Sequence, residues 1–388
     1  MKLIQSLFLS LFTMTIMAQN VMTPEKLIQL KKVSAKGISK DGKFVIYQTS
    51  QYNIKKHKTK KKLFKIAIDG GEPIEIKKAK QFLDNPKIKN GLKLFSKAVQ
   101  LENIKGSDIH KDAPKSNVKI YNELNYRHWD TWNEGKFNHV FYAPVGKKKE
   151  KTDIMKGEMF DCPQKPFGGA EDYVWDNDGT KILYVSKKLK GTKYAISTNS
   201  DIYEYDLKSK TTKNLTPYNK GYDTHPAFSE QGELAFLQMK RDGYESDKND
   251  IIVVKNGKHI NLTANWDGTV NSFKWSKDGK QIYFVAPIGG TVHLFVIKAS
   301  ENQQPKQITS GQFDIRGIVG EVNNKMVVSR TDMNHASELF VVDLSNGKMT
   351  QLTHANDKVY NSVILGKVEK RMVKTTDGKD MVCWVTYP

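Results

Sequence analysis

Short apolar runs recur along this chain, and a turn precedes most of them. The clearest are Phe44–Tyr47, Ile182–Val185, Leu234–Leu237 and Ile282–Val285. Apolar and polar residues do not alternate within these runs, so both faces of each run are expected to be buried. The pattern predicts short strands that lie in sheets packed between neighbouring sheets.

The turn itself repeats with a spacing of 44 to 53 residues. Its positions are Gly42, Gly91, Gly135, Gly179, Gly232, Gly279 and, without glycine, Asn324. A repeat of this length with several strands per unit is typical of a β-propeller, whose blades bury their faces only by stacking on one another. The sequence therefore predicts an all-β fold, a seven-bladed β-propeller of four-stranded blades.

The blades share one order of strands. In the clearest unit the four strands are expected at Phe273–Ser276, Gln281–Ala286, His293–Ile297 and Lys306–Thr309. Fourth strands end alike, in Asn214–Thr216, Asn261–Thr263, Gln307–Thr309 and Gln351–Thr353. The unit around Gly91 departs from this order, because no aromatic residue precedes its turn and residues 105–119 read as a long loop.

Three further segments flank the propeller, which is expected over residues 38–355. Residues 1–18 combine Lys2, an apolar stretch and the small residue Ala18, which is the order of a secretory signal peptide and too short for a membrane span. We expect export to the periplasm or the medium, with no membrane span after cleavage. Residues 19–37 should hold a short helix that Thr23 caps and Pro24 begins. Residues 356–388 begin another region with a hairpin.

Charge and cysteine content narrow the choice of partner. The formal net charge is +20, yet only five of the 62 basic residues are arginines, and the lysines are spread over every blade. Nucleic-acid readers cluster arginine, so we expect no nucleic-acid partner. Cys162 and Cys383 have no framework spacing, which leaves both a disulfide and two free thiols open.

Several motifs together resemble a known family. They are Met22–Glu25, Lys36–Gly42, Tyr126–Trp132, His139–Phe141, Phe167–Tyr173 and Thr376–Gly378. In these motifs the chain resembles the propeller half of the prolyl oligopeptidase family of serine peptidases, and within it the bacterial dipeptidyl-peptidases of the fifth type and acylaminoacyl-peptidases. The resemblance implies an exopeptidase that acts at the N-terminus of peptides, with an α/β-hydrolase domain that follows the propeller and begins, truncated, at residues 356–388.

The residues that would break a peptide bond are not found in this sequence. An α/β-hydrolase needs Gly-x-Ser-x-Gly to present its serine. The nearest match, Gly37–Lys40, continues with Asp41 instead of glycine and lies in a propeller turn. We therefore predict no catalytic residue in this chain and no activity of the chain alone. The nine histidines form no ligand pair and no glycine-rich phosphate loop occurs, so no metal or cofactor is expected.

The resemblance also suggests what the propeller contributes. Its partners would be a peptide substrate and the hydrolase domain, and its loops would supply a carboxylate for the substrate ammonium group. The candidates are Glu171 and Asp172, then Asp130, with Arg127 and Trp129 as contacts for carbonyl groups and side chains. Loop capping and packing between blades are the structural alternatives for the same residues. A different function also stays open, that of a stand-alone exported propeller that binds protein partners. No signal for an oligomeric state is found.

Overall fold

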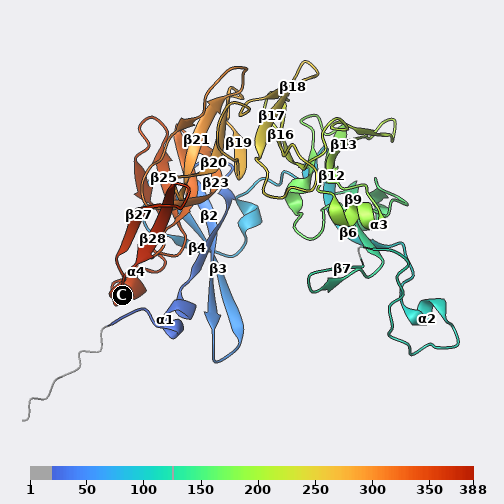
Figure 1. Ribbon diagram of the computed structural model, residues 1–388, viewed down its shortest axis with the longest axis horizontal. Coiled ribbons are helices and arrows are strands. Elements are labelled where there is room, and N and C mark those ends of the chain that lie inside the picture. The colour runs from blue at the N-terminus through green and yellow to red at the C-terminus, as the bar shows by residue number, and fades with distance from the viewer. Residues whose placement is uncertain (1–19, 125) are drawn as a thin grey trace, which may run out of the picture.

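Strands dominate the computed structural model, which describes residues 20–124 and 126–388 (Figure 1). The predicted signal peptide lies outside the described residues and is not tested. The predicted short helix is confirmed as α1 (Pro24–Gln29), whose first turn is capped by Thr23 through a 3.3 Å hydrogen bond from Lys26 N. Within the described residues, no helix has the length and apolar character that a membrane crossing needs.

The described strands from Lys32 to Gln351 fall into six groups of four, here called blades 1 to 6, and the strands within each blade pair antiparallel. A parallel pairing between Val292 and Asp314 joins the last two blades into one eight-stranded sheet. Blade 1 contains β1 (Lys32–Ile38), β2 (Phe44–Asn53), β3 (Lys58–Ala67) and β4 (Ile74–Ile76). Blade 2 contains β5 (Ile88–Lys89), β6 (Leu92–Gln100), β9 (Lys136–Pro144) and β10 (Thr152–Asp153). Blade 3 contains β11 (Tyr173–Trp175), β12 (Lys181–Ser186), β13 (Asp201–Asp206) and β14 (Thr212–Asn214).

The second half of the propeller repeats this arrangement. Blade 4 contains β15 (Asp223–Phe228), β16 (Leu234–Gln238), β17 (Asp250–Lys255) and β18 (Lys258–Asn261). Blade 5 contains β19 (Ser272–Trp275), β20 (Gln281–Ile288), β21 (Thr291–Lys298) and β22 (Lys306–Gln307). Blade 6 contains β23 (Asp314–Val322), β24 (Lys325–Thr331), β25 (Glu338–Asp343) and β26 (Met349–Gln351). A hairpin follows, β27 (Val368–Lys374) and β28 (Asp380–Thr386), as expected for the last segment.

The seventh blade that the repeat predicted is not found among the described residues. The turns at Gly91 and Gly135 belong to one blade, because β6 pairs with β9 along its whole length, from Leu92 opposite Pro144 to Gln100 opposite Lys136. The chain between these strands, residues 101–135, is an insertion about as long as a blade. Among its described residues, 101–124 and 126–135, the insertion holds α2 (Gly106–Ile109) and the short hairpin of β7 (Arg127–His128) and β8 (Thr131–Trp132). An insertion of this length imitates the period of a repeat.

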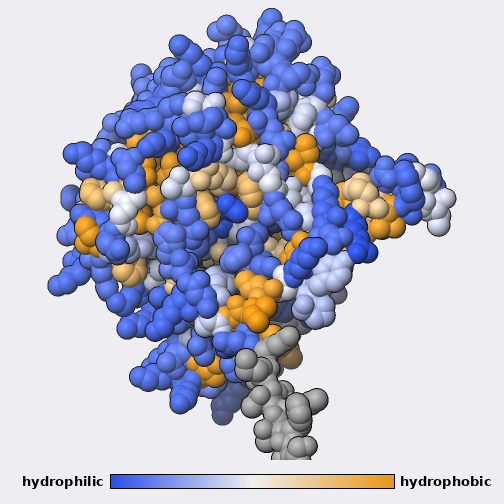
Figure 2. All heavy atoms as spheres, turned by 90° about the vertical axis from the view of Figure 1, so that its left-hand side faces the viewer, coloured by the Kyte–Doolittle hydropathy of each residue, from blue (hydrophilic) through white to orange (hydrophobic). Residues whose placement is uncertain are grey.

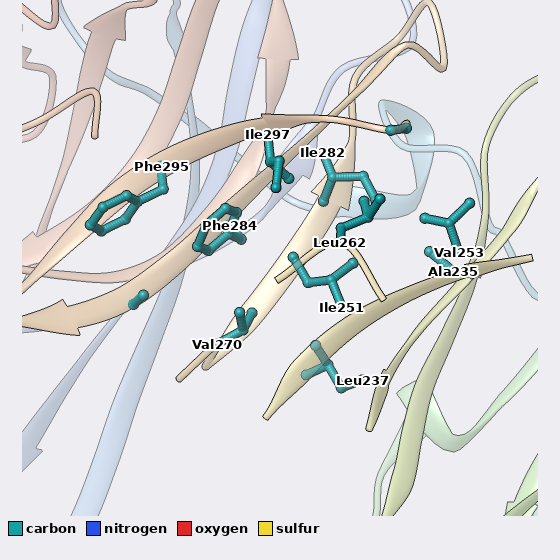
Figure 3. Close-up of a cluster of buried hydrophobic side chains, with 12 residues drawn as sticks. Ala235, Leu237, Ile251, Val253, Leu262, Val270, Ile282, Phe284, Phe295 and Ile297 are labelled. Carbon is teal, nitrogen blue, oxygen red and sulfur yellow. The ribbon is translucent and has the colours of Figure 1, made fainter. Parts of the chain in front are cut away.

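Apolar clusters join consecutive blades, as the unbroken apolar runs predicted. Leu183, Val185 and Phe236 are fully buried between blades 3 and 4. Figure 3 shows the next cluster, in which Leu237 and Ile251 of blade 4 lie near Phe284 of blade 5. Other clusters join blades 2 and 3, blades 5 and 6, and blades 6 and 1.

Blades 1 and 2 share no such cluster in the part of the chain that the structure describes. The linker between them contacts blade 1 instead, where Lys40 N donates to Phe82 O at 2.9 Å. This linker includes the short 3-10 helix η1 (Ala79–Gln81). The blades accordingly follow an arch from β2 and β3 through β20 and β16 to β12 and β6 (Figure 1).

A buried threonine at the end of each of four fourth strands explains why these strands end alike. In each case the threonine Oγ1 accepts a hydrogen bond from a backbone N–H at the start of the third strand. The pairs are Ile202 N to Thr216 at 3.0 Å, Ile251 N to Thr263 at 3.1 Å, Leu294 N to Thr309 at 3.0 Å and Leu339 N to Thr353 at 2.8 Å. The acceptor ties the fourth strand to the start of the third strand, and no threonine of the four exceeds 2% exposure. The recurring threonine is therefore a structural device of the blades.

Antiparallel pairing places two kinds of connection at the same end of the blades. The loops between second and third strands lie there, and so do the connections from one blade to the next; we call this end the loop face. It carries the insertion 101–135, the segment 187–200 with α3 (Gly191–Ile196), and the loops 239–249, 289–290 and 332–337. The C-terminal hairpin reaches it as well, since Trp384 Nε1 donates to Gly290 O at 3.0 Å. The opposite end, with the turns at Gly42, Gly232 and Gly279, is the turn face; the 3-10 helix η2 (Lys148–Glu150) also lies in a loop of that end.

Candidate functional site

Exposed apolar side chains gather on the loop face. Among the large hydrophobic residues that are more than about two-fifths exposed in the described chain, all except Ile74 and Val145 belong to loops, helices or strand ends of this face or to the C-terminal segment. They include Leu27 of α1 at 58%, Ile196 of α3 at 69% and Met372 of β27 at 56% exposure. In Figure 2 apolar surface is visible beside the start of the grey trace, at the end that carries α1. Exposed apolar side chains that gather at one end of a molecule are typical of a surface that contacts another protein domain.

The hairpin β7–β8 presents three of the predicted site residues. Trp129 and Asp130 form its two-residue loop, and Trp129 adopts a φ of 51°, a left-handed conformation that a bulky residue rarely takes. Arg127 holds this turn, because its Nε donates to Trp129 O at 2.6 Å while its guanidinium lies 5.3 Å from the Trp132 ring. Trp129 is 70% exposed as a result.

The second predicted segment meets this hairpin through an aromatic contact. The rings of Trp129 and Phe167 lie 5.1 Å apart in an edge-to-face arrangement. Phe167 is 72% exposed and stands in the loop that leads to the 3-10 helix η3 (Ala170–Asp172). The structure therefore brings together two segments that the sequence singled out and that are separated by about 40 residues of chain.

Glu171 and Asp172 have different surroundings. Asp172 is only 3% exposed, and its Oδ2 accepts Gln164 N at 2.9 Å; burial raises the pKa of its carboxyl to about 6. Glu171 is exposed. The glycine pair before them leaves room for both carboxylates, since a Cβ at Gly168 would lie 2.2 Å from Asp172 Oδ2 and a Cβ at Gly169 would lie 2.6 Å from Glu171 Oε2.

Two residues that sequence reasoning missed complete this region. His225 lies in a bulge of β15 with a φ of 56°. Its strand contacts η3, which carries Glu171. Burial lowers the pKa of His225, and the negative charge of Glu171 acts in the opposite direction. Lys87 Nζ donates to Ala170 O at 2.5 Å and also to Tyr173 O, and burial lowers its pKa to about 8. Neither a bulge nor a single lysine among many gives a signal in the sequence.

The arrangement can hold a cation beside an aromatic surface. Glu171 offers an exposed carboxylate, burial lowers the pKa of His225, and Trp129 and Phe167 add apolar area. Asp130 is exposed, and its carboxylate accepts a bond from the hydroxyl of Thr131 at 3.2 Å. In the described part of the chain, no three histidine, cysteine or acidic side chains are placed to hold a metal ion. Cys162 and Cys383 are both free thiols, which answers the question that their spacing left open.

Comparisons with known proteins agree with this architecture. A sequence profile described as the dipeptidyl peptidase IV N-terminal region matches residues 245–382. Dipeptidyl-peptidase 5 of Porphyromonas gingivalis is 32% identical over an alignment that covers 95% of this chain and 60% of that protein, and the Porphyromonas endodontalis protein of the same name is 31% identical with the same coverage. The chain thus spans about three-fifths of the length of these relatives.

A solved structure shows the same fold. Acylaminoacyl peptidase of Pyrococcus horikoshii superposes with a TM-score of 0.67 over 93% of this chain and 58% of that peptidase, at 13% sequence identity. At this level of identity the likeness concerns the fold alone.

Proposed function

Because the chain is the propeller region of a dipeptidyl-peptidase-like protein related to the prolyl oligopeptidase family, we propose that it gates and anchors peptide substrates for an exported serine exopeptidase. The substrates are peptides with a free N-terminus, from which short units are removed. The serine nucleophile and its base belong to a hydrolase domain outside this sequence, since no Gly-x-Ser-x-Gly occurs in the 388 residues.

The distribution of exposed apolar side chains carries this proposal. They gather on the loop face, from α1 through the insertion 101–135 to the C-terminal hairpin. The turn face carries only Val145 of this set and the edge strand β4 only Ile74. A domain that docks on the loop face would remove this area from water, at about 25 cal/mol per Å² of apolar surface. The same domain would enclose Glu171 and Trp129 in a cavity between the two parts.

Glu171 is the proposed anchor for the α-ammonium group of the substrate. An ammonium N–H that donates to an exposed carboxylate becomes a strong, charge-assisted hydrogen bond once the docked domain excludes water. Asp172 acts differently, because it is buried and bound to the Gln164 backbone; it positions the loop that presents Glu171. Trp129 would contact the first side chains of the peptide, with Arg127 holding the turn and Asp130 at its rim.

The test compares two substrates in the polypeptide that carries this region together with its hydrolase domain. Glu171→Gln should raise KM for a chromogenic dipeptide with a free N-terminus by about 10- to 100-fold, the size of one charge-assisted hydrogen bond, and leave the N-acylated substrate unchanged. Glu230→Gln is the matched control, since Glu230 is exposed on the turn face. An equal loss with both substrates contradicts the anchor. If the unaltered protein hydrolyses neither of the two substrates, the function of a stand-alone propeller that binds protein partners is favoured instead.

Export is part of the same proposal and depends on residues 1–18 alone. The lysine, apolar stretch and small residue in this segment have the order of a cleaved signal. N-terminal sequencing of the protein recovered from the cell envelope should begin at Gln19. A protein that keeps Met1 and stays with the cytosolic fraction contradicts export.

A further inference from the structure

Arg330 occupies an unusual position at the end of β24. Its guanidinium lies 4.2 Å from the ring centre of Phe313 and 4.6 Å from that of Phe340. The side chain is half-buried, and burial lowers its pKa. The two rings stabilise the cation by their π-faces but offer it no hydrogen-bond acceptor. The five N–H donors of this group therefore need acceptors from elsewhere.

The carboxylates around Arg330 are already engaged by other donors. Asp332 accepts His335 Nδ1 at 2.8 Å, and Asp357 accepts His354 Nδ1 at 2.9 Å. Glu338 lies opposite Arg330 across the strand pair, but its carboxylate already accepts two hydrogen bonds. One comes from the hydroxyl of Thr353, and the other comes from Ala355 N at 3.0 Å. Within the described residues, no acidic group lies within 4.0 Å of the Arg330 guanidinium.

A cavity of about 330 Å³ borders these groups on the loop face. Arg330, Asp332, His335, Glu338, Asp357 and Tyr360 contribute to its wall. The N–H donors of a guanidinium group lie along the edge of its plane. A planar carboxylate fits that edge with two parallel hydrogen bonds, which a spherical or tetrahedral anion does not use as well.

The charge of the wall selects the kind of anion. Asp332, Glu338 and Asp357 border the same cavity as Arg330, so a doubly charged phosphate would meet three acidic side chains. A singly charged carboxylate that carries an ammonium group or peptide N–H groups meets Arg330 and the acidic wall together. A short peptide has this combination of charges.

We propose that this cavity binds the free C-terminal carboxylate of a short peptide, with Arg330 as the residue that holds the carboxylate. The site lies on blade 6, whereas Glu171 precedes blade 3. It needs neither Glu171 nor a hydrolase domain. A result against the proposed function would therefore leave this site unaffected.

The test uses triglycine as probe and triglycinamide, which lacks the carboxylate, as its matched partner. The side-chain Nε–H signals of the protein are few, because the sequence has five arginines, and Arg330→Gln identifies the signal of Arg330. Triglycine should shift this signal in a saturable manner, and triglycinamide should not. Calorimetry should show that Arg330→Gln weakens triglycine binding at least about tenfold and that Arg330→Lys weakens it less. Arg371→Gln is the control, because it removes an exposed arginine paired with Glu369, and it should leave triglycine binding unchanged.

Four results would overturn the assignment. Binding of the amide as tightly as the acid excludes a carboxylate site, and this comparison needs no variant, so it holds even if Arg330→Gln destabilises blade 6. Triglycine binding that survives Arg330→Gln in a folded protein excludes Arg330. A larger shift of the Arg330 signal with inorganic phosphate than with triglycine, or no shift with either, excludes the peptide.

Discussion

Replacing Thr263 by valine removes a hydroxyl group from the blade interior without changing the shape of the side chain. Thr263 is fully buried, and its Oγ1 accepts Ile251 N at 3.1 Å and donates to Asp250 Oδ1 at 2.6 Å. In the valine variant the N–H of Ile251, itself fully buried, is left without an acceptor. The variant therefore tests whether the repeated threonine stabilises the blade.

The structure gives the expected size of the effect. A buried N–H without a partner costs about 1–3 kcal/mol, and the lost bond to a carboxylate adds about 1.5 kcal/mol. Asp250 also pairs with Lys248 Nζ at 2.8 Å, which limits the second contribution. We expect Thr263→Val to lower the free energy of unfolding by about 2–4 kcal/mol. Thr263→Ser keeps the hydroxyl and should cost about 1 kcal/mol for the lost methyl group.

Urea unfolding followed by tryptophan fluorescence measures the difference. Thr350→Val in the edge strand β26 is the control, because Thr350 is exposed and valine suits a strand. The expected order of stability is wild type and Thr350→Val, then Thr263→Ser, then Thr263→Val. If Thr263→Val unfolds at the same urea concentration as Thr350→Val, the threonine hydroxyl does not hold the strands together.

Two further variants test particular contacts. Burial alone would lower the pKa of His139, but the hydrogen bond and charge of Asp153, 2.9 Å away, outweigh it and raise the pKa. The stabilising contribution of His139 should thus be complete below about pH 6 and be lost as pH rises through the raised pKa. The difference in unfolding midpoint between wild type and His139→Gln should therefore shrink from about pH 5.5 to 8. A difference that stays constant over this range contradicts the ion pair. Gly168→Ala places a Cβ 2.2 Å from Asp172 Oδ2 and should lower the free energy of unfolding by about 2 kcal/mol or more. Gly317→Ala is the control, because a Cβ at Gly317 has no neighbouring atom within 4 Å and should cost little. Equal effects of the two variants contradict the close packing of the loop around Gly168.

The strands of the blades could be predicted because their signals are local. Turns such as Ser276–Gly279 read clearly, since Ser276 Oγ donates to Asp278 Oδ1 at 2.7 Å and Gly279 adopts a φ of 69°. The number of blades could not be predicted in the same way. The insertion between Gln100 and Lys136 has the length of a blade, and only the pairing of β6 with β9 shows that it is not one.

The candidate site shows the same division. Its two segments were visible as motifs, but their contact through Trp129 and Phe167 depends on the left-handed turn at Trp129. The burial of Asp172 beside an exposed Glu171 depends on how closely Gly168 approaches it. Arg330 gave no signal at all, because its position beside the rings of Phe313 and Phe340 is a property of the folded blades.

Amide hydrogen exchange tests most directly the claim that the loop face docks on a catalytic domain. The measurement compares this region alone with the polypeptide that also carries the hydrolase domain. If the loop face docks on the catalytic domain, we expect added protection in the loops 239–249, 289–290 and 332–337 and in the hairpin of β27 and β28. Exchange in the turns at Gly42, Gly232 and Gly279 should stay unchanged. Protection confined to those turns, or none on either face, would contradict this docking.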